Sequence, residues 1–421
     1  MAEKYTKPRG TYDILPNESY KTEYVRKIFR ETVRAFQYKE IITPVFEKAG
    51  LFERSVGDTS DIIQKEMYKF PDKKGRIFAL RPEGTAPVVR AYIENNLGSL
   101  SEISKLFYIG PMFRYDRPQK GRYRQFFQYG IENIGSDSAF TDAEVIALGY
   151  NFLKGLGLMN FVLEINSIGC SNCSKDLDEA LQNYFKPYLD DLCTDCKIRL
   201  HKNPKRILDC KVKTCKKIAE DAPVILDYLD EECKTHFEEV KKYLDILEVP
   251  YIVNPKIVRG LDYYSKTAFE FIDSNLGAQN TLIGGGRYDS LIKQLGGKDV
   301  PGIGFAGGFE RLLLAMEVEK VVIEKGDNPK IFLIALGEKA KTESIKILNK
   351  LRTSGISADY AFSKDSMKAQ MKAANKVNSE YSLILGEDEL KNNEIILKEM
   401  ETGNQEILKM SELIEKAGSL V

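Results

Sequence analysis

Residues Phe113 to Glu132 read FRYDRPQKGRYRQFFQYGIE, and this stretch carries the most informative strand pattern of the chain. It predicts the end of one strand, a basic turn from Arg117 to Arg122, and a second strand from Tyr123 to Ile134. Alternate residues of a strand share one face, because successive side chains point to opposite sides of a sheet. The residues that share one face of the second strand are Arg124, Phe126, Gln128, Gly130 and Glu132.

The preceding strand, predicted from Lys105 to Tyr115, presents Met112, Arg114 and Asp116 on one face by the same two-residue period. If the two faces coincide, polar groups converge there, and Gly130 leaves room for a ligand against the backbone. A purely structural sheet seldom gathers so many polar groups on a buried face, because each would need a hydrogen-bond partner. The hairpin alone is equally compatible with a solvated sheet face that binds nothing.

A second informative stretch, PGIGFAGGFERLLLAM from Pro301 to Met316, joins a glycine-rich strand directly to a helix. Arg311 falls in the first turn of that helix. The free N–H groups and the helix dipole favour anions at a helix N-terminus, and a guanidinium adds a bidentate ligand for phosphate. The alternative is that Arg311 pairs with a local carboxylate such as Glu310.

The flanking segments predict a mixed sheet with helices. Helical periodicity runs from Glu18 to Gln37 with Asn17 as its cap, and a strand should follow from Glu40 to Phe46. Pro44 restricts that strand to a sheet edge or a bend. Further strands are predicted at Phe161–Ser167, Tyr251–Val258, Thr267–Ile272, Thr281–Ile283 and Gly302–Gly308, and helices at Thr141–Leu156 and Phe309–Glu319.

These patterns divide the chain into three parts. Residues 169–249 are rich in cysteine and lysine and mostly helical, and they look inserted into a mixed sheet formed by residues 1–168 and 250–325. Residues 329–421 alternate strands with helices, which predicts a small α/β domain with a mainly parallel sheet. The predicted fold class is α+β: an antiparallel sheet flanked by helices, with a helical insertion and a C-terminal α/β domain.

The composition is that of a globular protein, with 43% hydrophobic and 29% charged residues among 421 and a formal net charge of zero. No apolar run reaches the length of a membrane span, so we expect no membrane partner. Residues Met1 to Gly10 are polar and hold no apolar segment of the kind found in secretory signals. The sequence therefore predicts a cytoplasmic protein.

Positive charge gathers in one segment although the net charge is zero. Residues 197–217 hold nine Lys or Arg and one acidic residue, Asp209. Such a patch is able to hold nucleic-acid phosphates, and the alternative is an ordinary solvated segment. The candidate phosphate ligands are Lys205, Arg206, Lys211 and Lys213.

All seven cysteines lie between Cys170 and Cys233. Cys170 and Cys173 form one C-x2-C pair and Cys193 and Cys196 another, at a spacing that fits a four-thiolate zinc template. The alternative is a helical segment packed around reduced thiols. Zinc is possible but not favoured, and no protein-bound metal is predicted, because further thiols leave the ligand set undefined: Cys210, Cys215 and Cys233.

Three segments together resemble the signature motifs of class II aminoacyl-tRNA synthetases: the helix and strand that end at Pro44, then Phe113–Glu132, then Pro301–Met316. Three more resemble segments of the histidyl-tRNA synthetase family: LRPEGT at Leu80–Thr85, RGLDYY at Arg259–Tyr264 and GGGRYD at Gly284–Asp289. The C-terminal domain resembles the class IIa anticodon-binding domain. Six matches in order along one chain are far more specific than any one of them.

The resemblance implies a two-step histidine–tRNA ligase. The carboxylate of L-histidine attacks the α-phosphorus of ATP to give histidyl-adenylate and pyrophosphate, and the 3′ end of tRNA(His) then takes the histidyl group. A carboxylate is already ionised at neutral pH, so the first step needs positioning and charge neutralisation rather than a general base. The resemblance also implies Mg²⁺ with the ATP, and a homodimer joined through Asn17–Ala49.

The resemblance assigns individual residues as well. Arg259 and Arg114 match catalytic arginines that meet the histidine carboxylate and the α-phosphate. The residues that match the histidine site are Glu83, Thr85, Arg114, Gln128, Glu132, Arg259, Tyr263, Tyr264 and Tyr288. Those that match the ATP site are Arg114, Asp116, Arg122, Phe126 and Arg311. Asp116 departs from the family, which usually has Glu at that position.

Other functions remain open at this point. A paralogue of the same catalytic domain serves as the regulatory subunit of ATP phosphoribosyltransferase, but it usually lacks the anticodon-binding domain and has lost catalytic groups. Another class IIa synthetase is disfavoured by RGLDYY and by the pair Glu132 and Tyr264. A tRNA-binding module without turnover is disfavoured by the presence of Arg114, Arg259 and Arg311.

Overall fold

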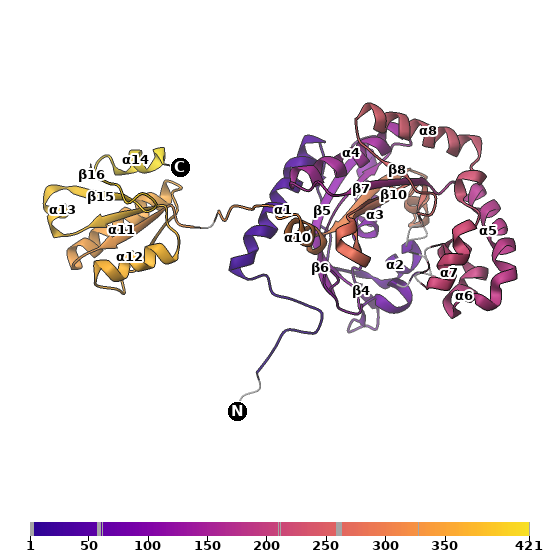
Figure 1. Cartoon of the computed structure of the whole chain (residues 1–421), viewed down its shortest axis with the longest axis horizontal. Helices are drawn as coiled ribbons and strands as arrows, with labels where there is room; N and C mark the ends of the chain where they lie inside the picture. Colours follow the sequence, from indigo (N-terminus) through magenta and orange to yellow (C-terminus); the bar gives the residue numbers. More distant parts are fainter. Residues whose placement is uncertain are drawn as a thin grey trace. The chain divides into compact units, whose positions relative to one another are not determined.

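The computed structural model describes residues 4–56, 60, 62–208, 210, 212–257, 263–326 and 328–420. Residues 258–262, which include Arg259, lie outside these ranges, as do Asp209 and Lys211. The chain divides into two compact units, Met1–Ile323 and Glu324–Val421 (Figure 1). Among the described helices, none is long and apolar enough to cross a membrane.

The first unit is built on an eight-stranded sheet with strand order β1-β5-β6-β11-β10-β9-β7-β8. The five pairs from β5 to β7 are antiparallel, and the outer strands β1 and β8 pair in parallel. This confirms the predicted antiparallel sheet. The strands are β1 (Lys39–Glu40), β5 (Ser104–Phe113), β6 (Gln125–Ile134), β11 (Gly302–Gly308), β10 (Thr281–Arg287), β9 (Ser265–Ile272), β7 (Val162–Ser167) and β8 (Ile252–Val253).

Strands β5 and β6 form the predicted hairpin. Met112 lies opposite Phe126 and Gly110 opposite Gln128, so these side chains share one face of the sheet. The next strand, β11, continues that face with Gly308 opposite Gln128. The space above Gly110 is filled by the Arg81 guanidinium, whereas Gly308 leaves open space beside Gln128.

The face ends earlier than the alternation predicted, because β5 ends at Phe113. The Arg114 amide still donates to Arg124 O at 2.9 Å, and the Asp116 amide then turns back to Arg114 O at 2.9 Å. This tight turn takes Arg114 and Asp116 off the strand.

Helices α1 (Pro16–Ala35), α4 (Ala139–Gly155) and α10 (Phe309–Val318) pack together against the sheet (Figure 1). Helix α1 buries Val25, Phe29 and Val33 in the main core of this unit. The expectation that Asn17 caps α1 is wrong. The cap is Leu15, and Pro16 opens the helix because its missing N–H and fixed φ suit the first helical position.

A three-stranded sheet lies apart from the large one and is formed by β2 (Phe46–Lys48), β4 (Ile77–Leu80) and β3 (Lys69–Pro71). The predicted strand at Glu40–Phe46 is therefore split between two sheets. Pro44 lies in the break, as expected for a residue without an N–H for the ladder. Helices α2 (Ala49–Val56), α3 (Thr85–Glu94) and α9 (Leu291–Gln294) pack near this sheet.

The insertion is helical, as predicted. Helices α5 (Ser171–Phe185), α6 (Thr194–Lys202) and α7 (Lys213–Ile218) surround a small core of their own, and α8 (Glu231–Ile246) returns along α4 (Figure 1). Five of the seven cysteines are buried in the insertion: Cys173, Cys196, Cys210, Cys215 and Cys233.

The second unit holds a five-stranded sheet of order β13-β12-β14-β15-β16, which is mixed rather than mainly parallel. Strands β12 (Ile331–Ala335), β13 (Ala358–Tyr360) and β14 (Tyr381–Leu385) are parallel as predicted. An unpredicted hairpin of β15 (Glu394–Glu399) and β16 (Gln405–Lys409) adds two antiparallel strands. The helices are α11 (Glu338–Thr353), α12 (Met367–Lys376), α13 (Glu387–Asn392) and α14 (Leu413–Ser419).

Candidate active site

A cavity of about 330 Å³ lies over the glycine-rich face of β6, β11 and β10. All five residues predicted for ATP line it: Arg114, Asp116, Arg122, Phe126 and Arg311. Gln128, predicted for histidine, also lines it. The structure therefore brings together residues from three distant stretches of the sequence.

Three guanidinium groups line this cavity together with three carboxyl groups, those of Asp116, Glu270 and Glu310. Desolvation lowers the pKa of Arg311, and the neighbouring charges of Arg114 and Arg122 lower it further. Desolvation also lowers the pKa of Arg114. Cations held this close together repel one another, and an anion placed among them relieves that repulsion. The cavity is therefore suited to a polyphosphate.

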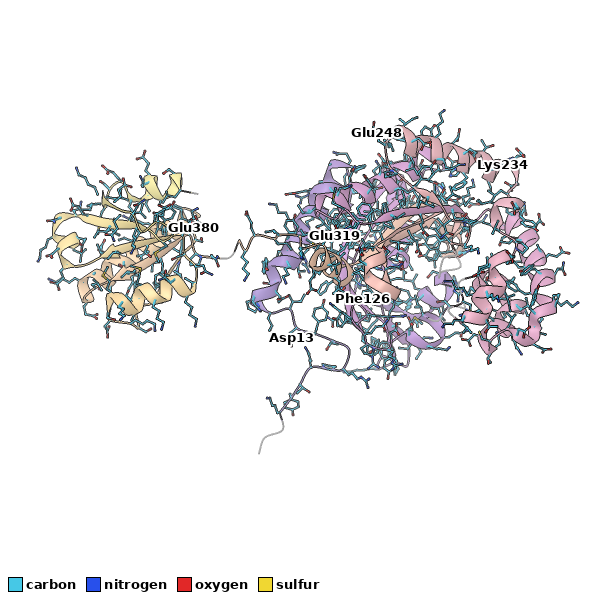
Figure 2. All side chains as sticks on the ribbon, viewed as in Figure 1. Asp13, Phe126, Lys234, Glu248, Glu319 and Glu380 are labelled. Atoms are coloured by element: carbon cyan, nitrogen blue, oxygen red, sulfur yellow. The ribbon has the colours of Figure 1, made fainter. Side chains whose placement is uncertain are left out.

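The hairpin positions these groups. Arg122 forms an ion pair with Asp116, and the guanidinium of Arg114 lies 5.4 Å from the ring centroid of Phe126, which Figure 2 labels. Arg124, predicted to share this face, lies instead 3.9 Å over the ring of Tyr115 and does not line the cavity. The reason is that Arg124 precedes β6, where the alternation of the strand does not yet apply.

Glu310 lies in the first turn of α10 and lines the cavity. Its Oε1 accepts hydrogen bonds from the Tyr12 hydroxyl at 2.6 Å and from the Phe127 amide at 2.8 Å. Arg311 donates from Nη1 to Thr281 O at 3.0 Å. Both groups fix the start of α10 to the sheet at the edge of the cavity.

A buried carboxyl stands two residues along the same face of β6 from Gly130. Glu132 is 1% exposed, and the Tyr288 hydroxyl donates a hydrogen bond to its Oε2. Among the described residues, Glu132 Oε1 has no hydrogen-bond partner. A Cβ at Gly304 would lie 2.2 Å from Glu132 Oε2, so only glycine leaves room for this carboxyl. An oxygen buried without a partner is suited to accept an N–H from a ligand.

Aromatic side chains surround this carboxyl. The rings of Tyr263 and Tyr264 lie 4.7 Å apart, and those of Tyr263 and Tyr288 lie 5.9 Å apart. A Cβ at Gly286 would lie 2.9 Å from the ring of Tyr264. The glycines of the GGGRYD and PGIG stretches thus make room for the predicted imidazole site.

The loop before α3 supplies a second buried carboxylate. Glu83 accepts hydrogen bonds from the amides of Thr85 at 2.6 Å and Ala86 at 2.9 Å, which fixes its orientation. Burial raises the pKa of Glu83 while these amides and Arg114 counteract it. Arg114 Nε donates to Pro82 O at 2.9 Å, so one arginine joins this loop to the cavity.

Two residues in the site were not predicted. Tyr108 is buried opposite Gly130, where an added Cβ would lie 2.4 Å from its hydroxyl. Continuing the alternation of the first strand back from Met112 would have found it. Glu270 on β9 lines the cavity and accepts a hydrogen bond from the Thr281 hydroxyl at 3.2 Å, and no local pattern marks it.

Replacing Glu132 by glutamine should stabilise the protein increasingly as the pH rises. Burial raises the pKa of Glu132 from 4.5 to about 8. Between these values the folded state keeps a proton that the unfolded state has lost, so folding stability declines as the pH increases. Glutamine removes this penalty, and urea unfolding should show the variant gaining roughly 3 kcal/mol relative to wild type between pH 5.5 and 8.5.

The matched control is exposed Glu102→Gln, whose difference from wild type should not change with pH. An E132Q difference that is equal at both pH values would show that the carboxyl is not held protonated.

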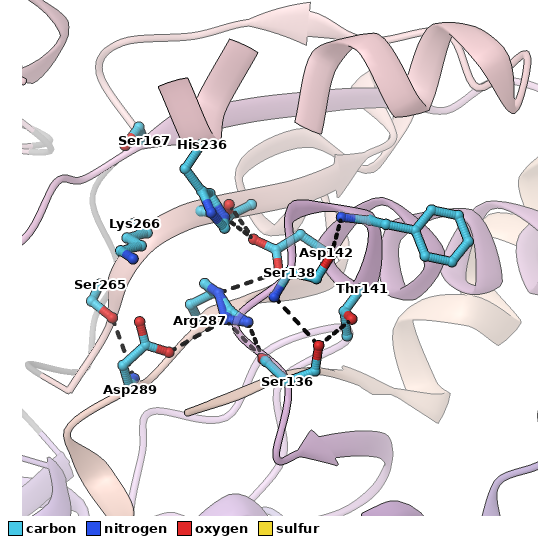
Figure 3. A network of polar contacts seen from close by, with 12 residues as sticks. Ser136, Ser138, Thr141, Asp142, Ser167, His236, Ser265, Lys266, Arg287 and Asp289 are labelled. Atoms are coloured by element: carbon cyan, nitrogen blue, oxygen red, sulfur yellow. Dashed lines mark hydrogen bonds and ion pairs between the residues drawn. The ribbon is translucent and has the colours of Figure 1, made fainter. Parts of the chain in front are cut away.

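A buried polar network centres on Asp142 and Arg287 (Figure 3). Asp142 of α4 accepts a hydrogen bond from the Thr267 hydroxyl at 2.5 Å and lies 2.8 Å from His236 Nε2. Arg287, which is fully buried, places Nε 3.3 Å from Asp142 Oδ1 and Nη1 3.4 Å from Asp289. The network therefore ties α8 of the insertion to β9 and β10 of the sheet.

The basic residues of the insertion that were predicted to bind phosphate differ in their surroundings. Lys205 pairs with Asp178 at 3.0 Å, whereas Lys213 is exposed. Lys205 and Arg206 line a cavity of about 550 Å³ together with Tyr263 and Tyr264. This cavity lies between the insertion and the predicted histidine site.

Comparisons with known proteins agree along nearly all of the chain. The model of the histidyl-tRNA synthetase family matches residues 10–312, and that of the anticodon-binding domain matches residues 330–420. The histidine–tRNA ligase of Clostridioides difficile (strain 630) is 50% identical over 410 residues, covering 97% of this chain and 98% of that protein. The histidine–tRNA ligase of Caldanaerobacter subterraneus subsp. tengcongensis is 49% identical over 410 residues, with coverage of 97% and 98%.

A solved structure agrees as well. The crystal structure of apo S. aureus histidyl-tRNA synthetase has a TM-score of 0.84 to this chain at 41% identity, and the match covers 98% of this chain and 99% of that one. These matches favour the ligase over the regulatory paralogue. The chain therefore belongs to the histidyl-tRNA synthetase family, whose members are ATP-dependent histidine–tRNA ligases.

Proposed function

We propose that the chain activates L-histidine with ATP and transfers the histidyl group to the 3′ end of tRNA(His), in the cytoplasm. One observation carries this proposal. A single face of β6 leads from Phe126 and Gln128, which line the arginine-rich cavity, past Gly130 to the buried carboxyl of Glu132. A polyphosphate and an imidazole bound at the two ends would meet in between.

The chemistry of the first step fits these groups. The histidine carboxylate attacks the α-phosphorus of ATP, the bond to the β-phosphate oxygen breaks, and pyrophosphate leaves. No proton has to be removed, so the protein contributes by orienting the reactants and stabilising charge at phosphorus. Arg114 is placed for both tasks, since it lines the cavity and binds the loop that holds Glu83.

The remaining roles follow from position. Arg311 and Arg122 would bind the other phosphates, and Phe126 would stack on adenine. Glu132 and Tyr264 would contact the imidazole nitrogens, while Glu83, Thr85 and Gln128 would hold the α-amino group. The assignment of Arg259 to the carboxylate rests on the RGLDYY resemblance, and that of Tyr263 and Tyr288 on their place beside Glu132.

Magnesium with the ATP also fits the cavity. Mg²⁺ prefers carboxylate, phosphate and water oxygens. Glu270 on β9 lines the cavity, and its carboxylate would be a ligand for the ion. The ion would neutralise phosphate charge.

Pyrophosphate exchange with ATP tests the activation step. Exchange should depend on L-histidine and should be absent with threonine, proline or glycine. Glu132→Gln should raise the histidine KM more than the ATP KM, because an amide presents an NH2 where the ring N–H needs an acceptor. Exchange without any amino-acid dependence would refute the proposal.

We further propose that two copies of the chain pair through the segment Asn17–Ala49 and its surroundings. The apolar stripe of α1 does not by itself require a partner, since it is buried within the chain. An apolar surface lies exposed on the segment after β1 and on the three-stranded sheet. Its exposed residues are Ile42 (84%), Val45 (42%), Phe46 (48%), Phe70 (39%) and Ile77 (50%).

Sedimentation should therefore show a dimer at micromolar concentration. The double variant Ile42→Glu and Phe46→Glu should be a monomer, because the introduced charges would have to be buried without partners. The exposed control Ile345→Glu on α11 should remain dimeric. A monomeric wild type would refute this interface.

The insertion is proposed to hold the acceptor end of the tRNA. Its basic cavity shares Tyr263 and Tyr264 with the histidine site, which is where the 3′ end must arrive. The C-terminal unit would bind the anticodon stem, as its family match suggests.

Neutralising Lys205, Arg206, Lys211 and Lys213 together should raise the tRNA KM and flatten the dependence of tRNA binding on salt. The slope should fall by nearly one unit for each phosphate that the variant no longer binds. Histidine-dependent exchange should remain near wild type. The control neutralises the exposed pair Lys234 and Lys242 on α8. An unchanged KM together with an unchanged slope would make this patch a solubilising surface.

A further inference from the structure

The seven cysteines of the chain gather in two clusters within the insertion. The thiol cluster consists of Cys193, Cys196, Cys210 and Cys215. The mixed cluster consists of Cys170, Cys173, Asp230 and Cys233. In each, the four sulfur or oxygen atoms all lie within 4.8 Å of one another. Every cysteine of the chain therefore belongs to one of the two clusters.

We propose that the insertion binds two zinc ions, one in each cluster. The thiol cluster supplies four thiolates, and the mixed cluster supplies three thiolates and a carboxylate. Both sets are complete tetrahedral ligand sets of the kind used by structural zinc sites, with no position left for a substrate. The inference is independent of the proposed function.

The distances between sulfur atoms fit this assignment. Zinc–sulfur bonds of about 2.3 Å at tetrahedral angles place two sulfur atoms about 3.8 Å apart. Cys193 Sγ lies 3.9 Å from Cys210 Sγ, and Cys170 Sγ lies 3.6 Å from Cys173 Sγ. Asp230 Oδ2 lies 3.1 Å from Cys170 Sγ, which is close enough for both atoms to share one ion.

Three helices of the insertion begin with the same arrangement of ligands. Cys170 and Cys173 are the cap and third residue of α5, and Cys193 and Cys196 are the cap and third residue of α6. Asp230 and Cys233 occupy these two positions of α8, so D-x2-C replaces C-x2-C there. Free amides and the helix dipole at such ends stabilise thiolates, the form that binds zinc. Within the mixed cluster, two such helix ends meet.

Backbone amides also donate to the sulfur atoms, as they commonly do around metal-bound thiolates. The Cys193 amide donates to Cys215 Sγ at 3.2 Å, and the Asp230 amide donates to Cys173 Sγ at 3.2 Å. Each bond joins two distant parts of the insertion through a ligand atom.

Along the chain, the ligands of the thiol cluster lie between the two ligand pairs of the mixed cluster. The mixed cluster joins the first and last segments of the insertion, Cys170–Cys173 and Asp230–Cys233, and the thiol cluster closes the segment from Cys193 to Cys215 between them. The two C-x2-C pairs whose spacing fits one zinc template thus belong to different sites. Small helical modules with little core of their own commonly need such cross-links.

Neither alternative accounts for this arrangement as well. Packing of reduced thiols accounts for their burial but not for four ligand atoms lying within 4.8 Å of one another in each of two clusters. All seven cysteines are free rather than disulfide-bonded, and three thiols around Asp230 could not all pair.

Elemental analysis of the purified full-length chain tests the proposal. Protein prepared with reductant and without chelator should contain about two zinc ions per chain. If the wild-type chain held only about one ion, and disruption of the thiol cluster removed that ion, the mixed site would be overturned. Less than about half an ion per chain would overturn both sites. Bound iron in place of zinc would also overturn the assignment.

Variants assign each ion to its cluster. Cys193→Ser with Cys210→Ser should lower the zinc content by one ion, and Cys170→Ser with Cys233→Ser should remove the other. The matched control is Leu200→Ala, which disturbs the same small core without removing a ligand and should keep both ions. A control that loses zinc as readily as the cysteine variants would contradict specific ligation.

Cobalt substitution of the wild-type chain avoids variants that fail to fold. Co²⁺ added after removal of zinc should give the intense visible bands of tetrahedral thiolate coordination until two equivalents are bound. The seven thiols should then be protected from a thiol reagent and become reactive on chelation. Weak octahedral bands, or thiols that react equally with and without metal, would contradict the proposal.

Discussion

Replacing Arg114 by alanine is expected to lower the rate of histidine-dependent pyrophosphate exchange by about two to three orders of magnitude, as removal of one charge-stabilising donor does in other active sites. The guanidinium lines the cavity beside Arg122 and Arg311, and Nε is fixed by Pro82 O at 2.9 Å. Its interaction strengthens as charge develops at phosphorus, so the loss should appear in kcat more than in the histidine KM.

The matched control is Arg117→Ala, because Arg117 belongs to the same turn but is exposed and does not line the cavity. Its exchange rate should stay within a few-fold of wild type. An Arg114→Ala enzyme with unchanged kcat would show that Arg114 binds no reacting group. An equal loss in both variants would point to damage of the turn instead.

Asp142→Asn is expected to destabilise the first unit by about 3 kcal/mol, although the substitution changes no volume. It leaves the guanidinium of Arg287, which is fully buried, without its nearest counter-charge at 3.3 Å. Asp289 lies 3.4 Å from the same guanidinium and compensates only in part. A buried charge that loses its partner keeps its desolvation cost, and this is why the loss is large.

The midpoint of urea unfolding, followed by circular dichroism, measures this effect. Asp137→Asn serves as the control, since Asp137 is exposed just before α4 and should leave the midpoint unchanged. The same change at Asp142 should also weaken the hold of α8, because His236 lies 2.8 Å from that carboxylate. A variant as stable as wild type would mean that Asp289 alone balances Arg287.

Strands of the eight-stranded sheet were predictable where their sequence patterns are strong and local. The alternation from Tyr123 to Ile134 and the glycine-rich run at Gly302–Gly308 both became strands close to their predicted bounds. The hairpin of β15 and β16 was missed because its short strands, EIILKE and QEILK, carry charges and little alternation. Tertiary pairing with β14 decides their conformation.

The residues of the candidate site that belong to sequence motifs could be predicted. Arg114, Phe126 and Arg311 meet in one cavity, as their stretches implied. Glu270 and the pair Asp142–Arg287 could not be found in this way, because strand register brings together residues that lie far apart in sequence. The same holds for the cysteines, whose grouping follows from helix positions and not from spacing.

Aminoacylation of a tRNA(His) transcript measures the proposed activity itself. With ATP, Mg²⁺ and L-histidine, the purified chain should form histidyl-tRNA(His), and omission of either histidine or ATP should abolish the product. A transcript for another amino acid should remain uncharged. Histidine-dependent charging would be the result that the buried Glu132 beside an arginine-lined cavity predicts. Failure to charge tRNA(His) by a folded protein that also shows no pyrophosphate exchange would contradict the account.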